Sequence, residues 1–342
     1  MHIGLYADTH GLHHRDALNH LMHDLPPEQM RTIDNARRCE ELGFDSMWFA
    51  DHLFMPIESK SSHKANISGT RAYRPRHTMM DAAVTMAAVA ASTRRLKLAT
   101  SVLIAPYRPP LSDARQFATL DILSGGRLIL GVGAGWMREE FDVVGRPFEH
   151  RGAITEECIE IYKRCWTHDV VEFHGDHYDF TNLSMDPKPL QKPHPPIVFG
   201  GVVPAGARRA ARCCDGLYMT FLDVDATPGR YQYLQDEARR ELDRVGRDPA
   251  EFAMQATVSI RLLDAAHPDA QEPGRRLGVG SPEQVLGDVA AFAANGYAHF
   301  VCFFECPRGD PDELRDQIEQ FGAEVLPAAR ALAPAGDWRK DL

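Results

Sequence analysis

Short apolar segments of strand length alternate with longer helical patterns along this chain, and eight such pairs can be counted. The strand-like segments are residues 3–7, 45–50, 96–102, 128–132, 197–199, 217–220, 254–262 and 299–303. The helical patterns that follow them cover about 26–43, 78–92, 109–125, 149–166, 205–214, 230–244, 282–294 and 312–330. This order predicts an α/β protein with a single (β/α)8 TIM barrel, and a doubly wound open sheet is the alternative.

One segment, about 167–196, interrupts the alternation after the fourth pair. Its first half contains VEFHGDHYDF, in which apolar and polar residues alternate, and its second half is rich in proline. This pattern predicts a small hairpin followed by an extended stretch, so we interpret the segment as an insertion. We therefore expect one barrel domain over 1–331 and a C-terminal tail over 332–342.

The segment RLILGVGAGWMREEF (127–141) joins the fourth strand to a glycine-rich turn. Glycines at 131, 133 and 135 allow the backbone to turn and to approach a ligand closely. The N–H groups of such a turn can face a flat or phosphorylated ligand. The spacing does not match the dinucleotide-binding pattern G-x-G-x-x-G, because Trp136 occupies the place of the third glycine.

Composition excludes several classes of function. The 342 residues include 38 Lys and Arg against 48 Asp and Glu, and the net charge of −10 argues against general nucleic-acid or anionic-membrane binding. The seven cysteines contain no C-x-x-C pair, which disfavours a disulfide framework or a zinc ribbon. The N-terminus lacks the pattern of a signal peptide, and no apolar run is long enough to span a bilayer. We expect a cytoplasmic protein without a metal, nucleic-acid or membrane partner.

Active sites of TIM barrels lie at the carboxyl ends of the strands, so the residues just after each strand are the candidates. These residues are Asp8, His10, Asp51, His52, Ser101, Gly133, Ala134, Gly135, Trp136, Gly200, Gly201, Thr220 and Phe221. Gly200 and Gly201 precede a predicted helix, so their N–H groups could bind a phosphate or form a simple tight turn.

Several motifs, in order along nearly the whole chain, are similar to those of the luciferase-like flavin and deazaflavin oxidoreductases. The motifs are WFADH, LATSVLIAPYRPP, QFATLDILSGGRLILGVGAGWMREEF, PHPPIVFGG and GSPEQV. The resemblance implies a TIM barrel that is usually dimeric and holds reduced FMN or coenzyme F420 in its mouth.

The resemblance also assigns roles to individual residues. Ser101 and Val102 match a bulge that often contains a non-prolyl cis peptide beneath the cofactor ring. The loop of Gly133, Ala134, Gly135 and Trp136 matches the one beside the ring, and Gly200 and Gly201 match the phosphate-binding turn. Asp51 is expected in the cofactor site with them.

His52 matches a histidine that lies next to the reacting carbon in several deazaflavin members. Its ordinary pKa of about 6.5 suits a proton acceptor at neutral pH, and a histidine that only hydrogen-bonds in the mouth is the alternative. In the sugar-phosphate dehydrogenase branch a glutamate follows the last glycine of the loop, whereas Trp136 stands here. The substrate and mechanism of that branch are therefore not implied.

The stretch 59–80 favours coenzyme F420 over FMN. It contains no acidic residue but several basic ones, namely Lys60, Lys64, Arg71, Arg74 and Arg76, with His63 and His77 as further candidates. A basic rim suits the phosphate and anionic glutamyl tail of F420, although an ordinary solvated loop has the same composition. We thus expect F420-dependent hydride transfer to or from a small organic substrate, with a reduced-FMN-dependent monooxygenase as the alternative.

Two other classes stay open. A metal-dependent hydrolase on the same barrel would use Asp8, His10 and His13, although these two histidines have two residues between them instead of the one that is usual in such hydrolases. The second class is a non-catalytic paralogue that only binds a flavin. For partners, we expect a small-molecule substrate, a separate flavin or F420 reductase, and a homodimer formed through apolar helices such as 82–91.

Overall fold

Eight parallel strands close into a barrel in the computed structural model, which describes residues 1–13, 22–61, 73–220, 228–271 and 273–336. In order around the barrel they are β1 (His2–Tyr6), β4 (Ser46–Phe49), β5 (Lys97–Thr100), β7 (Leu128–Gly133), β10 (Ile197–Gly200), β11 (Gly216–Thr220), β12 (Ala253–Leu262) and β14 (His299–Phe304). Pairing of β7 with β10 and of β14 with β1 completes the ring. The predicted TIM barrel is confirmed, and the open-sheet alternative is wrong.

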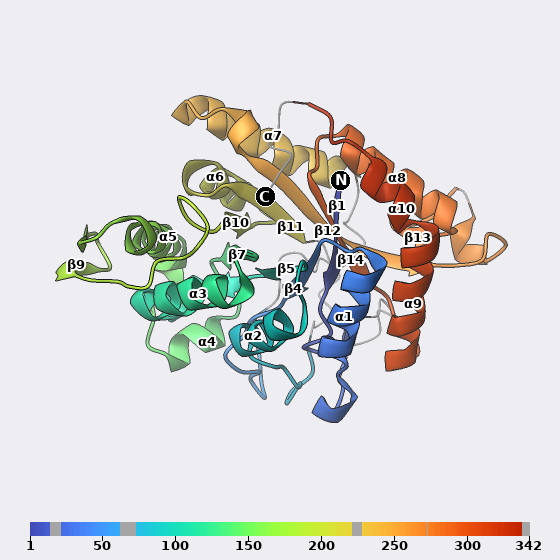
Figure 1. Ribbon diagram of the computed structural model, residues 1–342, viewed down its shortest axis with the longest axis horizontal. Helices are drawn as coiled ribbons and strands as arrows, with labels where there is room; N and C mark the ends of the chain where they lie inside the picture. The colour runs from blue at the N-terminus through green and yellow to red at the C-terminus, as the bar shows by residue number, and fades with distance from the viewer. Residues whose placement is uncertain (14–21, 62–72, 221–227, 272, 337–342) are drawn as a thin grey trace.

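The helices surround the strands (Figure 1). They are α1 (Thr32–Leu42), α2 (Ala82–Ser92), α3 (Pro110–Ser124), α4 (Arg138–Val143), α5 (Arg151–Thr167), α6 (Pro204–Cys213), α7 (Pro228–Val245), α8 (Pro282–Ala294), α9 (Pro311–Glu324) and α10 (Leu326–Ala331). Short 3-10 helices cover Pro27–Gln29, Ala105–Tyr107, Phe148–His150, Pro249–Glu251 and Pro268–Ala270. No helix in the described ranges is long and apolar enough to cross a membrane.

Three predicted helices differ from the observed ones. The first begins at Thr32, because the Pro26-Pro27 segment forms a separate 3-10 turn. The second begins at Ala82, where the Asp81 side chain accepts a hydrogen bond from the Val84 N–H and caps the helix. The last one, predicted as 312–330, is two helices, since Pro327 has no N–H to continue α9 and is accepted in the first turn of α10.

The insertion forms the expected hairpin, with β8 (Val171–His174) antiparallel to β9 (Asp179–Leu183). Glu157 of α5 accepts hydrogen bonds from the backbone N–H groups of residues 176–178 and so ties the hairpin turn to the barrel. The remaining strands are short: β2 (Leu12–His13) pairs with β3 (Met22–His23), β6 (Leu103–Ile104) pairs with β7, and β13 (Val279–Gly280) pairs with β12. Residues 337–342 of the predicted tail lie outside the described residues.

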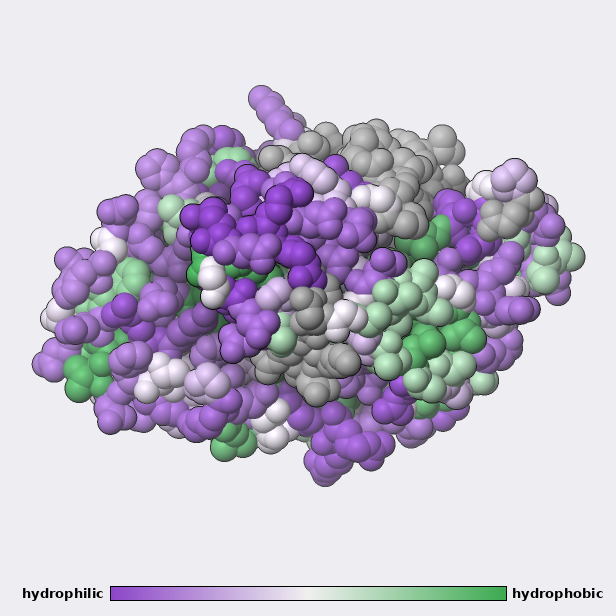
Figure 2. Space-filling model, turned by 90° about the horizontal axis from the view of Figure 1, so that it is seen from above, coloured by the Kyte–Doolittle hydropathy of each residue, from purple (hydrophilic) through white to green (hydrophobic). Residues whose placement is uncertain are grey.

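Hydrophobic side chains fill two layers. The larger layer lies between the strands and the helices, and the smaller one fills the barrel interior around Trp48 and Tyr218, whose rings stack with centroids 4.4 Å apart. The face in Figure 2 is mostly hydrophilic, with one larger hydrophobic area toward its right side. The packed interior leaves the carboxyl end of the barrel as the place where a ligand can enter.

Candidate active site

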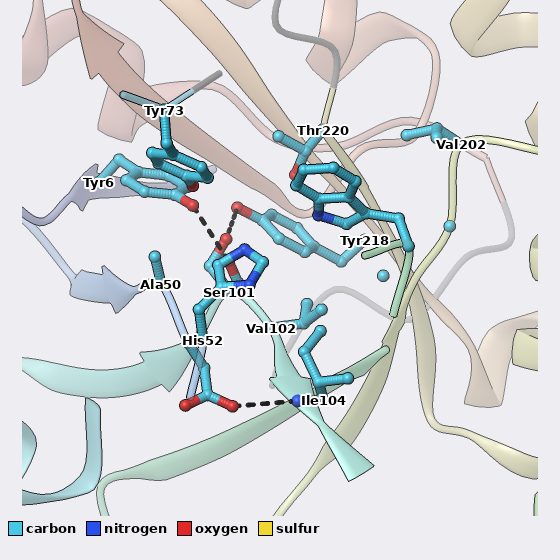
Figure 3. A pocket seen from close by; sticks show the side chains of 14 residues that line it. Tyr6, Ala50, His52, Tyr73, Ser101, Val102, Ile104, Val202, Tyr218 and Thr220 are labelled. Carbon is cyan, nitrogen blue, oxygen red and sulfur yellow. Dashed lines mark hydrogen bonds between the residues drawn. The ribbon is translucent and has the colours of Figure 1, made fainter. Parts of the chain in front are cut away.

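Two adjoining hollows lie at the carboxyl ends of the strands. The inner pocket is lined by Tyr6, Ala50, Asp51, His52, Tyr73, Ser101, Val102, Ile104, Trp136, Gly200, Gly201, Val202, Tyr218 and Thr220 (Figure 3). The outer cavity, of about 660 Å³, lies between the glycine loop after β7 and the first turns of α5 and α6. The two hollows share lining residues, including Val102 and Trp136, so they form one mouth.

His52 lies in the wall of the inner pocket between two aromatic rings. Its ring centroid is 5.5 Å from that of Tyr73 and 5.7 Å from that of Trp136, and both contacts are edge-on. The His52 side chain is 6 % exposed, and its Nδ1 lies 2.9 Å from Oε2 of Glu140. Within the described ranges Nε2 has no hydrogen-bond partner, so it is available to a molecule in the pocket.

Glu140 lies on α4, the short helix that follows the glycine loop. Its side chain is 2 % exposed. Its Oε1 accepts a hydrogen bond of 2.7 Å from the Leu53 N–H and one of 3.3 Å from the Tyr107 hydroxyl. Glu140 therefore holds both the side chain of His52 and the backbone that follows it.

The adjacent Glu139 binds the loop after β4 at residues 60 and 61. Its Oε1 accepts hydrogen bonds from the N–H groups of Lys60 (2.7 Å) and Ser61 (3.3 Å). Burial raises the pKa of Glu139, but the hydrogen bonds from Ser61 and Lys60 outweigh it and lower the pKa to about 2. Two neighbouring carboxylates of one short helix thus fix the loop after β4 against the loop after β7.

Ser101 is held from across the barrel (Figure 3). The Tyr6 hydroxyl donates to the Ser101 carbonyl oxygen at 3.0 Å, and the Ser101 hydroxyl lies 2.9 Å from the Tyr218 hydroxyl, which also contacts Thr257. The peptide bond between Ser101 and Val102 is cis, as the family resemblance implies. Strands β1, β11 and β12 therefore fix the backbone at the floor of the pocket.

The side chain of Val102 leaves no room for a Cβ at two of the glycine positions. A Cβ at position 133 would lie 2.4 Å from Cγ2 of Val102, and a Cβ at position 200 would lie 2.7 Å from its Cγ1. Gly135 has a φ of +80°, a conformation that favours glycine. The glycine loop is thus required by the packing around Val102 and by its own backbone.

Asp51 lines the inner pocket, but its carboxylate binds protein groups. It forms an ion pair with Arg108 and accepts a hydrogen bond of 3.2 Å from the Ile104 N–H. Burial raises the pKa of Asp51, and the charge of Arg108 opposes this rise. These contacts position the segment after β5, so the Asp51 side chain supports the pocket wall.

Three arginines line the outer cavity: Arg138, Arg151 and Arg209. Arg138 forms an ion pair of 2.6 Å with Glu149, and Arg209 one of 2.8 Å with Glu156. Gly200 and Gly201 form the opposite wall, where α6 begins, as the predicted phosphate-binding turn requires.

Arg151 differs from the other two arginines. In the part of the chain that the structure describes it forms no ion pair; its guanidinium donates to the carbonyl oxygens of Phe148 (2.8 Å) and Gly135 (3.2 Å). Burial lowers the pKa of Arg151 and the positive charges of Arg138 and Arg209 lower it further, while the carboxylate of Glu149, which also lines the cavity, opposes this. The cavity is thus lined by three arginines and one glutamate, an excess of positive charge that an anion would balance.

The predicted basic rim is only partly described. Lys60, Arg74 and Arg76 are exposed, whereas His63, Lys64 and Arg71 lie outside the described residues. His77 is buried, and burial lowers its pKa, so it contributes no positive charge near neutral pH.

All ten residues predicted for the cofactor and catalytic sites line the mouth. They are Asp51, His52, Ser101, Val102, Gly133, Ala134, Gly135, Trp136, Gly200 and Gly201. Their roles toward a cofactor stay predictions. Of the other strand-end residues, Thr220 lines the pocket, Asp8 and His10 do not, and Phe221 lies outside the described residues.

Sequence reasoning missed Glu140, Arg151, Tyr6 and Tyr73. Glu140 lies on α4, shortly beyond the glycine loop, and Arg151 begins α5; no spacing rule indicates which charged residue of a helix turns inward. Tyr6 ends β1 with its ring pointing into the barrel mouth, and alternation along that strand is a signal that could have identified it.

The residues of the metal-hydrolase alternative do not converge. Asp8 accepts hydrogen bonds from the Arg31 N–H (3.0 Å) and from Asn35 (3.2 Å), while Nε2 of His13 lies 2.9 Å from the Ser259 hydroxyl. Over the described ranges no three His, Cys, Asp or Glu residues are arranged to hold a metal ion.

The family model for luciferase-like monooxygenases matches residues 12–272 of this chain. The chain belongs to the luciferase-like monooxygenase family. Members of this family are flavin- or deazaflavin-dependent oxidoreductases or monooxygenases, and relatives of both kinds are found.

The F420-dependent glucose-6-phosphate dehydrogenase of Amycolatopsis mediterranei is 30 % identical over 338 residues, which cover 88 % of this chain and 94 % of that protein. The FMNH2-dependent dimethylsulfone monooxygenase of Pseudomonas putida is 28 % identical over 295 residues, covering 72 % and 77 %. Among solved structures, an F420-dependent secondary alcohol dehydrogenase in complex with an F420-acetone adduct has a TM-score of 0.73 at 21 % identity, covering 96 % of this chain and 99 % of that chain. This last likeness shows the luciferase-like fold.

Proposed function

We propose that this luciferase-like protein binds coenzyme F420 in the barrel mouth and transfers hydride to or from a small organic substrate. One observation carries the proposal: the inner pocket, where Nε2 of His52 is available, shares a wall with an arginine-lined cavity. A cofactor with a planar ring and a phosphate fits such a mouth, with the ring near His52 and the phosphate near Arg151.

The charge of the outer cavity supports a phosphate-bearing group. Among the described residues Arg151 forms no ion pair; burial and the neighbouring arginines disfavour its charged form, and Glu149 favours it. An anion there would form charge-assisted hydrogen bonds and would relieve this repulsion. F420 and FMN both carry a phosphate, so this feature supports the cofactor class.

The residues of the inner pocket suit an alcohol or carbonyl substrate. When bound, F420 supplies a hydride donor or acceptor. Nε2 of His52 would take the proton that an alcohol releases as its carbon loses hydride, and would return it in the reverse direction. Tyr73 and Trp136, on either side of the imidazole, would limit access of water to it.

The F420 choice is also supported by the dehydrogenase of Amycolatopsis mediterranei, whose similarity extends over more of both chains than that of the monooxygenase. The second candidate is a reduced-FMN-dependent monooxygenase, which the relative in Pseudomonas putida favours. A monooxygenase, or hydride transfer to a substrate, would need a separate reductase that supplies the reduced cofactor, whereas hydride transfer from a substrate would itself reduce F420.

Replacement of Arg151 tests where the phosphate binds. We expect Arg151→Ala to weaken F420 binding about 10- to 100-fold, since a hydrogen bond to a charged group contributes about 1.5–3 kcal/mol. Cofactor fluorescence in a titration of the purified protein measures the effect. The matched control is Arg164→Ala on the same helix, whose guanidinium pairs with Glu160 at the surface. Equal affinities of the two variants would contradict the assignment of the outer cavity.

A further inference from the structure

We propose that Glu140 sets the tautomer of His52, with the proton on Nδ1, and thereby makes Nε2 the proton acceptor of the site. This makes Glu140 a positioning residue, because it acts through the imidazole and does not line either hollow. The catalytic use of Nε2 rests on the proposed function, whereas the tautomer itself does not.

Two donors bind Oε1 of Glu140 and leave Oε2 to face the imidazole. The Leu53 N–H can only donate. Burial raises the pKa of Tyr107 well above its ordinary value, so its hydroxyl keeps a proton to donate. Both bonds go to Oε1, and Oε2 faces the imidazole 2.9 Å from Nδ1.

This arrangement leaves one tautomer for a neutral His52. With Oε2 as the acceptor, Nδ1 carries the proton and donates to it across 2.9 Å. A neutral imidazole carries a single N–H, so Nε2 then holds the lone pair. When Nε2 takes a proton, the carboxylate stabilises the resulting imidazolium at 2.9 Å, with both groups almost fully buried.

The other neighbours of the ring do not compete for this role. The rings of Tyr73 and Trp136 stand at 75° and 85° to the imidazole, and burial raises the pKa of Tyr73, so its hydroxyl is neutral. His10, which lies nearby, has its pKa lowered to about 3 by burial and by the neighbouring histidines, so it is neutral as well. Asp51 directs its carboxylate to Arg108. Glu140 is the carboxylate that the described structure places on the imidazole.

The first test reads the tautomer directly. In the full-length protein, long-range 1H–15N NMR of the histidine side chains, with the His52 signal assigned by its loss in His52→Gln, reports which nitrogen carries the proton. We expect Nδ1–H in the wild type. In Glu140→Gln the amide can donate to Nδ1, so we expect the proton to move to Nε2. A wild-type Nε2–H signal, or an unchanged tautomer in Glu140→Gln, would overturn the proposal.

The second test measures the consequence for the reaction. We expect Glu140→Gln to lower the rate of F420-dependent hydride transfer at least about 100-fold at saturating cofactor, with F420 affinity changed by less than about threefold. Glu139→Gln is the matched control: it makes the same change on the same helix, but its carboxylate binds Lys60 and Ser61, so it should leave the tautomer unchanged. An equal loss of rate in both variants would show that α4 acts only by holding its loop.

F420 binding and the role of Glu140 can be contradicted independently of each other. If the protein does not bind F420 but the wild type shows Nδ1–H and Glu140→Gln shifts it, the proposed function is overturned and the assignment of Glu140 stands. If Glu140→Gln does not fold, Tyr107→Phe replaces it: loss of that hydroxyl leaves the Nδ1 contact in place, and a change of the wild-type tautomer in this variant would contradict the proposal.

Discussion

Asp113 is a carboxylic acid of α3 whose ionisation the fold opposes. Its side chain is buried, and burial raises its pKa to about 7, even though Arg108 lies near and the Tyr162 hydroxyl donates to it at 3.0 Å. Arg108 also binds Asp51 at the mouth, so this acid lies behind the wall of the candidate site.

The raised pKa of Asp113 predicts a pH-dependent stability. In the unfolded chain the group ionises near pH 3.8, whereas in the folded chain it stays protonated to about pH 7. Its contribution to stability is therefore complete below pH 3.8 and is lost as the pH rises through 7. Asn at position 113 cannot ionise. We therefore expect the free energy of unfolding of Asp113→Asn, relative to that of the wild type, to rise by up to about 4 kcal/mol from pH 4 to pH 8. Urea unfolding at both pH values measures this; a difference that stays constant with pH would contradict it.

Single residues of the site differ in how far sequence can predict them. His52, Ser101 and the glycines could be predicted because they follow strands directly, and the topology brings strand ends together. The side-chain contacts that hold these residues could not be predicted from the sequence. Whether Glu140 or Glu139 reaches His52 depends on the rotation of α4. That Arg151 pairs with no carboxylate among the described residues depends on where α5 begins.

At the scale of elements, α2 is unusual because its eleven residues include no charged side chain. Val84 is 68 % exposed, and Ala88 and Ala91 lie on the exposed side too. An apolar outer helix face of this kind is typical of an interface between subunits. We expect α2 to contribute the contact of a homodimer.

A charge on α2 tests this expectation. Val84→Asp should convert a dimer to a monomer without unfolding it, since the Val84 side chain is 68 % exposed in the single chain. Light scattering coupled to gel filtration measures the mass, and Leu123→Asp on the neighbouring α3 is a comparison at another exposed apolar residue. A wild-type protein that is monomeric at high concentration, or a dimeric Val84→Asp variant, would contradict the expected interface.

The elements themselves were more predictable than their connections. All eight strands and the insertion hairpin follow from apolar runs and turn residues. The short elements β6 and α4 do not, because two and six residues are too few for a periodic pattern. These elements form the mouth, so the sequence indicates the scaffold more fully than the site.

At the scale of the whole molecule, closure of the barrel gathers residues from Tyr6 to Tyr218 into one mouth. The chain has a net charge of −10, yet the outer cavity is lined by three arginines and one glutamate, and one of the arginines forms no ion pair in the described structure. A positively charged cavity in a negatively charged protein is expected where that protein binds an anion. We infer that this anion is the phosphate of F420, held with the deazaflavin ring near His52.

The most direct test is a titration of the purified full-length protein with F420 and, separately, with oxidised and reduced FMN, followed by fluorescence. We predict saturable binding of F420 and no response to either form of FMN. Binding of reduced FMN alone would contradict the choice of F420 and favour the monooxygenase. Absence of binding to all three would contradict the account of the mouth as a flavin or deazaflavin site.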